Sequence, residues 1–128
     1  MKYKEHETFI AVDLDRTLAV YHHGEYDSKG KTYIGPPVEK VVDMVKHLIE
    51  NGHRVKIFTA RNTSDREIYE AIQDWTKEHI GLPLEATNVK DFRMLCYIDD
   101  RAISIEANSG EIIGYDNQLL SIIEDIGI

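Results

Sequence analysis

The sequence is poor in cysteine, with Cys96 the single one among 128 residues. One cysteine cannot form an internal disulfide, which is typical of proteins in a reducing compartment. Long apolar runs are also missing: no stretch approaches the roughly 20 residues that cross a bilayer. The start MKYKEHE lacks the apolar core of a signal peptide. We therefore expect a cytoplasmic protein with no membrane partner.

Basic residues are in the minority, with 15 Lys and Arg against 23 Asp and Glu and a formal net charge of -8. A long nucleic-acid footprint needs a basic face to displace counterions, so this balance argues against one. Small phosphorylated substrates remain open, because a bound metal reverses the local charge. The length and the apolar content of 42% favour a single domain over residues 1–128.

Apolar periodicity predicts strands that alternate with helices. Strands are expected over residues 8–13, 53–59, 84–89 and 94–99. One helix is expected to start after Pro36-Pro37, with apolar residues from Val38 to Ile49 and a stop at Gly52. This alternation implies an α/β fold, with a central, mostly parallel sheet and helices on both faces.

The remaining elements follow from turn and cap signals. Ser64 and Glu67 have the spacing of a capping box, which predicts a helix that continues to about His79. Residues 103–115 read as a β-hairpin that turns at Asn108-Ser109-Gly110, and this hairpin is a candidate dimer edge. A closing helix is expected from about Asn117.

Polar side chains interrupt the apolar strands at one end only. Asp13 ends the first strand, Thr59 the second, and Asp99-Asp100 the strand before the hairpin, while Lys90 lies in the turn before that strand. In an open parallel α/β sheet, the ligand crevice lies outside the carboxyl ends of the strands. The pattern therefore predicts a functional site.

The residue types at this site favour phosphoryl chemistry. Several carboxylates that converge repel one another, and a hard divalent cation such as Mg²⁺ resolves the repulsion. The Thr59 hydroxyl and the Lys90 ammonium group suit phosphoryl oxygens, whose transfer depends on position and charge. Asp13 can act as a nucleophile that forms an aspartyl-phosphate, and Asp15 as the general acid and base.

Three short stretches resemble the motifs of the haloacid dehalogenase (HAD) superfamily of aspartate-nucleophile phosphatases. DLDRT resembles its DxDxT signature, FTAR its second motif and YIDDR its acidic fourth motif. The resemblance implies a Rossmann-like fold. It also implies that Asp13 is the nucleophile and Asp15 the acid/base. The magnesium ligands would be Asp13, Asp15 through its backbone carbonyl, Asp99 and Asp100.

The same resemblance assigns the phosphoryl group to Thr59 and to Lys90, the candidate for the third motif. Lys90 precedes Asp99 by only nine residues, where the family often has a full helix. Arg61 and Arg101 are therefore alternative cations, and each can equally be a structural ion-pair partner. An Arg after the second and fourth motifs also resembles the 3'-phosphatase domain of phage polynucleotide kinases. Position 16 is Arg where many members of the family have Gly.

The family usually carries a cap domain over its site, and this chain has little room for one. Residues 19–36 suffice for a β-hairpin flap, so we expect no full cap domain and a site open to a large substrate or closed by a neighbouring subunit. The aromatic and imidazole side chains of the flap, Tyr21, His22, His23, Tyr26 and Tyr33, can touch substrate. We interpret the two histidines as solvated loop residues and Cys96 as a small buried residue.

The leading hypothesis is a Mg²⁺-dependent phosphomonoester hydrolase for a small metabolite or a nucleic-acid end. One alternative is specifically a polynucleotide 3'-phosphatase, and another is a non-catalytic module of the same fold that binds phosphate or metal. A phospho-accepting receiver domain gathers similar residues. Its order along the chain differs, because there the acidic pair comes first and here it comes last.

Overall fold

The computed structural model describes residues 8–116 and 119–125. The chain divides into two compact units, and the division falls between Ile98 and Asp99.

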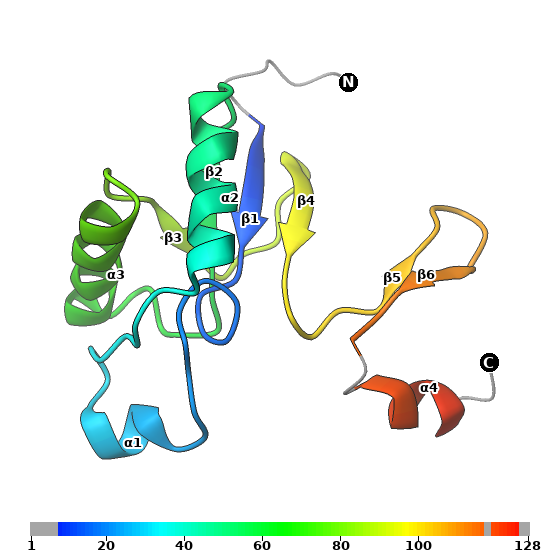
Figure 1. The fold of residues 1–128 in the computed structure, drawn as a ribbon, viewed down its shortest axis with the longest axis horizontal. Helices are drawn as coiled ribbons and strands as arrows, with labels where there is room; N and C mark the ends of the chain where they lie inside the picture. The colour runs from blue at the N-terminus through cyan, green and yellow to red at the C-terminus, as the bar shows by residue number, and fades with distance from the viewer. Residues whose placement is uncertain (1–7, 117–118, 126–128) are drawn as a thin grey trace. The chain divides into compact units, whose positions relative to one another are not determined.

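The first unit is built on a parallel four-stranded sheet (Figure 1). Its strands are β1 (Phe9–Val12), β2 (Val55–Phe58), β3 (Ala86–Thr87) and β4 (Met94–Ile98). Their order is β3-β2-β1-β4, and every neighbouring pair is parallel. All four strands lie within the expected ranges, and the predicted α/β fold with a mostly parallel sheet is confirmed.

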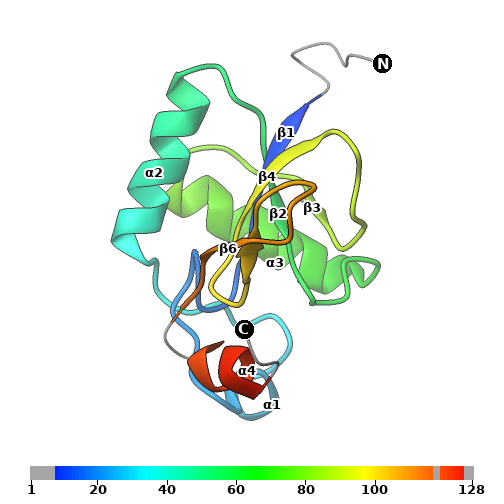
Figure 2. The ribbon, with the colours of Figure 1, turned by 90° about the vertical axis from the view of Figure 1, so that its right-hand side faces the viewer.

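Two helices, α2 (Glu39–Glu50) and α3 (Arg66–His79), cover this sheet (Figures 1 and 2). We expected helices on both faces, but within this unit α2 and α3 pack on the same face. The chain lays down β1, β2 and β3 in one direction across the sheet, so two right-handed crossovers place both helices on one side. The shared core contains Ile10, Val12, Val55 and Ile57 from the sheet and Val42, Val45, Ile68, Ile72 and Trp75 from the helices.

The helix ends show which sequence signals were correct. Gly52, the expected stop of α2, has φ 88°, and the following His53 N–H donates to the Leu48 carbonyl at 3.0 Å. The expected capping box at Ser64 is wrong. Asp65 is the N-cap of α3, and its carboxylate accepts from the backbone N–H groups of Glu67 and Ile68 at 2.9 and 3.3 Å.

Thr76 joins α3 to the segment that leads into β3. Its fully buried hydroxyl donates to the Gln73 carbonyl and accepts from the Leu84 N–H at 3.0 Å. Thr76→Val keeps the shape but leaves the Leu84 N–H without this acceptor, so we expect a loss of about 1–3 kcal/mol in the free energy of unfolding. Urea denaturation measures it, with exposed Thr32→Val as the control. Equal midpoints for the two variants would show that the hydroxyl does not stabilise this junction.

Residues 19–36, called the flap from here on, contain a helix where we expected a β-hairpin. Helix α1 (Glu25–Lys29) begins after Gly24 and carries a Glu25–Lys29 ion pair of 3.3 Å at i,i+4 spacing. No strand forms among these residues. Antiparallel pairing is confined to the base of the flap, where the Val20 N–H donates to the Pro36 carbonyl at 2.8 Å. The expected β-hairpin is therefore replaced by a short helix, which the Glu25–Lys29 pair stabilises locally.

The second unit begins at Asp99 and contains the predicted hairpin. Strands β5 (Ser104–Ile105) and β6 (Ile112–Gly114) are antiparallel. Asn108 and Gly110, in the expected turn, have φ values of 64° and 81°. Helix α4 (Leu120–Asp125) agrees with the expected closing helix, whose predicted start at Asn117 lies outside the described residues. Among the described helices, none has both the length and the apolar content needed to cross a membrane.

Candidate functional site

Strand register brings the polar strand ends together at the carboxyl edge of the sheet. Asp13 follows β1 directly, and its N–H donates to the carbonyl of Ile98, the last residue of β4, at 2.9 Å. Asp99 is bonded covalently to Ile98, so its backbone starts beside Asp13. Thr59 follows β2, which pairs with β1 on the other side.

Three carboxylates gather at this edge. Oxygens of Asp13, Asp99 and Asp100 lie within 4.8 Å of one another, and all three residues are half-buried. The Thr17 hydroxyl donates to Asp13 Oδ2 at 3.1 Å, and the Arg101 backbone N–H donates to Asp99 Oδ1. A set of hard oxygen donors fits Mg²⁺ better than softer metals. Sequence reasoning gave Thr17 no role, although the DxDxT pattern contains it.

The carboxylate of Asp15 is not part of this group and pairs with Arg61 instead. Arg61 Nε lies 2.8 Å from Asp15 Oδ2, and Nη2 lies 2.8 Å from Asp15 Oδ1. This is the bidentate geometry in which a guanidinium matches a carboxylate. Of the two roles that the sequence left open for Arg61, the geometry therefore favours the ion pair.

Thr59 is buried at the end of β2. Its N–H donates to the Thr87 carbonyl at 3.0 Å, and its hydroxyl oxygen accepts from the Arg61 N–H at 3.1 Å. The second bond uses a lone pair of the hydroxyl and not its hydrogen. The side chain therefore keeps the donor that a phosphoryl oxygen would require.

The loop after Asp13 holds Arg16 in an unusual backbone conformation. Arg16 has φ 74°, in the left-handed region that favours glycine. The loop is tightly wound, because the Leu18 and Ala19 N–H groups both donate to the Leu14 carbonyl and the Arg16 N–H donates to the Ala19 carbonyl. Arg16 therefore adopts a backbone conformation that suits glycine better than arginine.

Lys90 and Arg101 are both exposed. Lys90 lies in the segment between β3 and β4, and β3 is separated from β1 by β2. The assignment of Lys90 to the third motif stays a prediction.

The exposure of the flap histidines and of Cys96 in β4 can be compared with the expectations from the sequence. His22 and His23 are exposed, in agreement with the interpretation as loop residues, and Tyr26 is half-buried. Cys96 is exposed, so the expectation of a buried residue is wrong. Its strand, β4, lies at the edge of the sheet, whereas α2 and α3 pack on β2 and β3.

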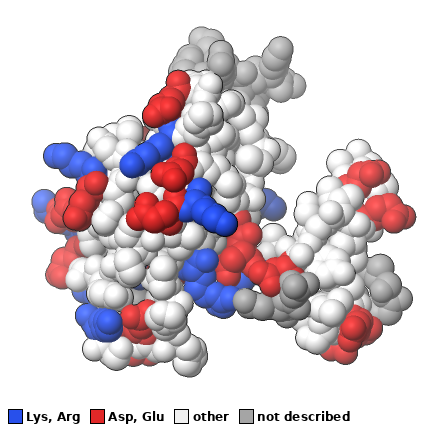
Figure 3. Space-filling model, in the orientation of Figure 1, with Lys and Arg blue, Asp and Glu red and all other residues white. Residues whose placement is uncertain are grey.

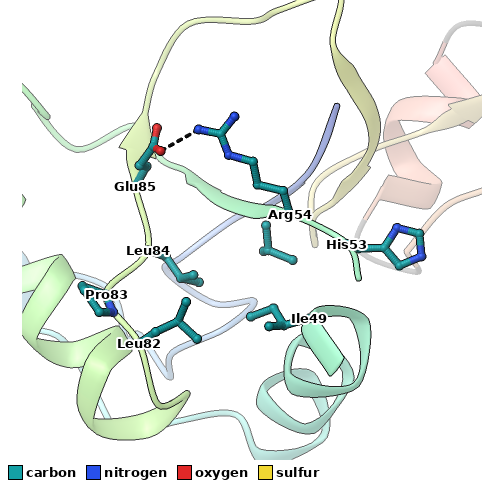
Figure 4. A pocket seen from close by; sticks show the side chains of 8 residues that line it. Ile49, His53, Arg54, Leu82, Pro83, Leu84 and Glu85 are labelled. Atoms are coloured by element: carbon teal, nitrogen blue, oxygen red, sulfur yellow. Dashed lines mark hydrogen bonds and ion pairs between the residues drawn. The ribbon is translucent and has the colours of Figure 1, made fainter. Parts of the chain in front are cut away.

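A cavity of about 170 Å³ lies at the opposite end of the sheet (Figure 4). It is formed where α2 ends, β2 begins and the chain enters β3, and Arg54 pairs with Glu85 at 2.6 Å on its rim. Its other lining residues are Ile49, His53, Val55, Leu82, Pro83 and Leu84. The cavity is separate from the candidate site, because it lies at the amino end of β2 and the site lies at the carboxyl ends of the strands.

Charge on the surface of the first unit is mixed. Figure 3 shows basic and acidic side chains interspersed over the face that carries α2. On the described part of this face, neither sign of charge forms a continuous patch (Figure 3).

Comparisons with known proteins support the fold alone. No protein-family model matches the chain, and no curated protein sequence matches it. Among solved structures, a conserved protein from Bacteroides thetaiotaomicron is similar, with 23% sequence identity and a TM-score of 0.53. The match covers 94% of this chain and 92% of that one, so the likeness extends over nearly the whole fold.

Proposed function

We propose that this protein is a Mg²⁺-dependent phosphomonoester hydrolase that acts through an aspartyl-phosphate, as its resemblance to HAD phosphatases implies. The observation that carries the proposal is the gathering of the Asp13, Asp99 and Asp100 carboxylates at the carboxyl edge of a parallel sheet. Asp15 stands two residues beyond Asp13 and is the candidate acid/base.

Two steps account for the proposed reaction. In the first, an Asp13 carboxylate oxygen attacks phosphorus and the bond to the leaving-group oxygen breaks. That oxygen takes the electron pair and a proton from the protonated form of Asp15. In the second, water attacks phosphorus and gives a proton to Asp15, while the bond to Asp13 breaks. Phosphate leaves, and both aspartates return to their starting states.

The charge on the substrate must be offset during both steps. Asp13, Asp99 and Asp100, with the backbone carbonyl of Asp15, are the proposed magnesium ligands. When bound, Mg²⁺ would supply positive charge for phosphoryl oxygens. Thr59 is proposed to donate its hydroxyl hydrogen to the phosphoryl group, with Lys90 as the proposed cation.

The proposed substrates are phosphomonoesters of small metabolites or of nucleic-acid ends, since the short flap leaves no room for a full cap domain. A polynucleotide 3'-phosphatase is the narrower alternative. A cytoplasmic location is part of the proposal, and the single cysteine of the sequence supports it.

Phosphate release from a panel of esters tests the proposal. The panel contains an aryl phosphate, sugar phosphates, nucleoside 5'- and 3'-monophosphates and a 3'-phosphorylated oligonucleotide, each assayed with Mg²⁺ and with chelator. Release that requires Mg²⁺ supports the enzyme, and the preferred ester chooses the substrate class. If folded protein that binds Mg²⁺ releases no phosphate from any ester, the non-catalytic binding module becomes the better description.

Replacement of Asp99 tests the proposed metal site directly. Loss of groups that only orient a metal ligand typically lowers metal affinity about 10- to 100-fold, and a direct ligand should matter at least as much. We expect Asp99→Asn to weaken Mg²⁺ binding by at least about tenfold in calorimetric titration. Asp43→Asn, an exposed aspartate on α2, is the matched control. Unchanged affinity would remove Asp99 from the metal shell.

A further inference from the structure

Arg61 is a nearly fully buried cation, with only 5% of its side chain exposed. A guanidinium removed from water destabilises the folded state unless charged and polar partners compensate. Asp15 supplies two of these partners through the bidentate pair at 2.8 Å. The position of the Asp15 carboxylate and the burial of Arg61 therefore depend on each other.

The remaining contacts of Arg61 are with the flap. Its Nη1 donates to the Lys31 carbonyl at 3.2 Å, and its guanidinium carbon lies 5.5 Å from the centre of the Tyr26 ring. One side chain thus connects the Asp15 carboxylate to two points of the flap, Tyr26 in α1 and Lys31 just beyond it.

Within the described part of the chain, few other contacts hold this part of the flap. No residue of α1 is buried, so apolar packing contributes little to its attachment. Lys31 Nζ lies 2.8 Å from Asp65 Oδ2 at the start of α3, and this hydrogen bond holds the pKa of Asp65 below its usual range. The Lys31–Asp65 pair is exposed, and exposed pairs contribute little to stability. Arg61 is therefore the principal buried anchor among these contacts.

We propose that Arg61 is a positioning residue that fixes the orientation of the Asp15 carboxyl group and anchors the flap through the same guanidinium. The part that concerns Asp15 rests on the proposed hydrolase function. A bidentate guanidinium needs both carboxylate oxygens as acceptors. Each oxygen keeps a second lone pair, so a water at the site can still give its proton to Asp15. Such a transfer is the part that Asp15 plays when water attacks the aspartyl-phosphate.

The kinetic test uses Arg61→Lys, which keeps the charge but loses the bidentate geometry. With 4-nitrophenyl phosphate, whose leaving group needs little protonation, we expect formation of the aspartyl-phosphate to continue and its hydrolysis to slow about 100-fold. Rapid-quench measurements should therefore show a burst of 4-nitrophenol close to one per enzyme and accumulation of phosphorylated protein. The KM should change only slightly. Arg66→Lys, at an exposed arginine of α3, is the matched control and should behave as the wild type.

A raised KM without accumulation of phosphoprotein would overturn the proposal and make Arg61 a phosphate ligand, as the sequence first suggested. An equal slowing of both steps would reduce Arg61 to a structural residue. Absence of turnover in the wild type would remove the hydrolase function and the catalytic role of the oriented Asp15 together, and the anchoring of the flap would still be open to measurement.

Hydrogen exchange measures the anchoring without any substrate. We expect Arg61→Met to raise the exchange rates of flap amides such as Ser28 and Tyr33 at least about tenfold, since these amides bond only within the flap. Asp15→Asn, which places an amide donor against the guanidinium, is the second variant if Arg61→Met fails to fold. It should produce the same change. Flap exchange equal to that of the wild type in the folded variant would overturn the anchoring role.

Discussion

Asp13→Asn protein is expected to release phosphate at least about 1,000-fold more slowly than the wild type while it folds normally. The side-chain amide is a poor nucleophile toward phosphorus, so no aspartyl-phosphate can form. The amide oxygen can still accept the Thr17 hydroxyl bond that Asp13 Oδ2 receives at 3.1 Å. The tight loop after β1 should therefore keep its shape, and thermal unfolding should occur within a few degrees of the wild type.

The comparison requires wild-type, Asp13→Asn and Asp43→Asn proteins purified in parallel and assayed with the best ester of the panel. Asp43 is exposed on α2, far along the chain from the site residues, and its replacement should leave the rate unchanged. Equal activity in all three proteins would show that Asp13 is not the nucleophile or that a contaminating phosphatase is responsible. Separate chromatographic fractions of the Asp13→Asn protein distinguish those two explanations.

Gly35→Ala should destabilise the fold by about 3 kcal/mol, the largest effect on stability expected from any single methyl group here. A Cβ atom at this position would lie 1.9 Å from the Val20 carbonyl oxygen, a distance that no rotamer change can relieve. Relaxation on the other side is opposed, because the Gly35 carbonyl accepts the buried Trp75 Nε1–H at 2.9 Å. Glycine is required here because two backbones approach closely.

Urea denaturation of Gly35→Ala measures this effect, and Gly114→Ala is the matched control. A Cβ at Gly114 would meet nothing nearer than the Ser104 Cβ at 3.9 Å, an ordinary contact. Its stability should stay within about 0.5 kcal/mol of the wild type. If both variants unfold at the wild-type midpoint, the backbone at the base of the flap can shift at little cost in free energy. The close approach of Val20 and Gly35 would then not contribute to stability.

The sheet could be predicted from the sequence because its signals are local. Val55 to Phe58 form a run typical of a strand, and Asp13, Thr59 and Asp99 follow apolar strands directly. Parallel pairing then brings strand ends together without further information. The catalytic, metal-binding and phosphate-binding roles of these residues stay predictions, because residue type and placement restrict the chemistry without demonstrating it.

Two kinds of feature could not be predicted from the sequence. In one, neighbouring residues suit the same structural position equally well; in the other, the contact joins residues that are distant in the sequence. Ser64 and Asp65 both suit a helix N-cap, and Asp65 takes this position because α3 begins at Arg66 in the folded chain. Arg61 and Asp15 are 46 residues apart, so no local pattern records their ion pair. The exposure of Cys96 follows from the position of β4 at the sheet edge, which a list of strands without their order does not give.

The base of the flap has a consequence for the evolution of the site. Its entry and exit are fastened to each other by the Val20–Pro36 bond and by the Val38 N–H that donates to the Leu18 carbonyl, both at 2.8 Å. The two ends of the flap are therefore held at a fixed separation next to the sheet, whatever residues lie between them. Each doubling of a closed loop adds only about 0.6 kcal/mol of closure entropy. A much longer segment, up to a folded module, can be inserted between residues 21 and 34 without disturbing the strands below.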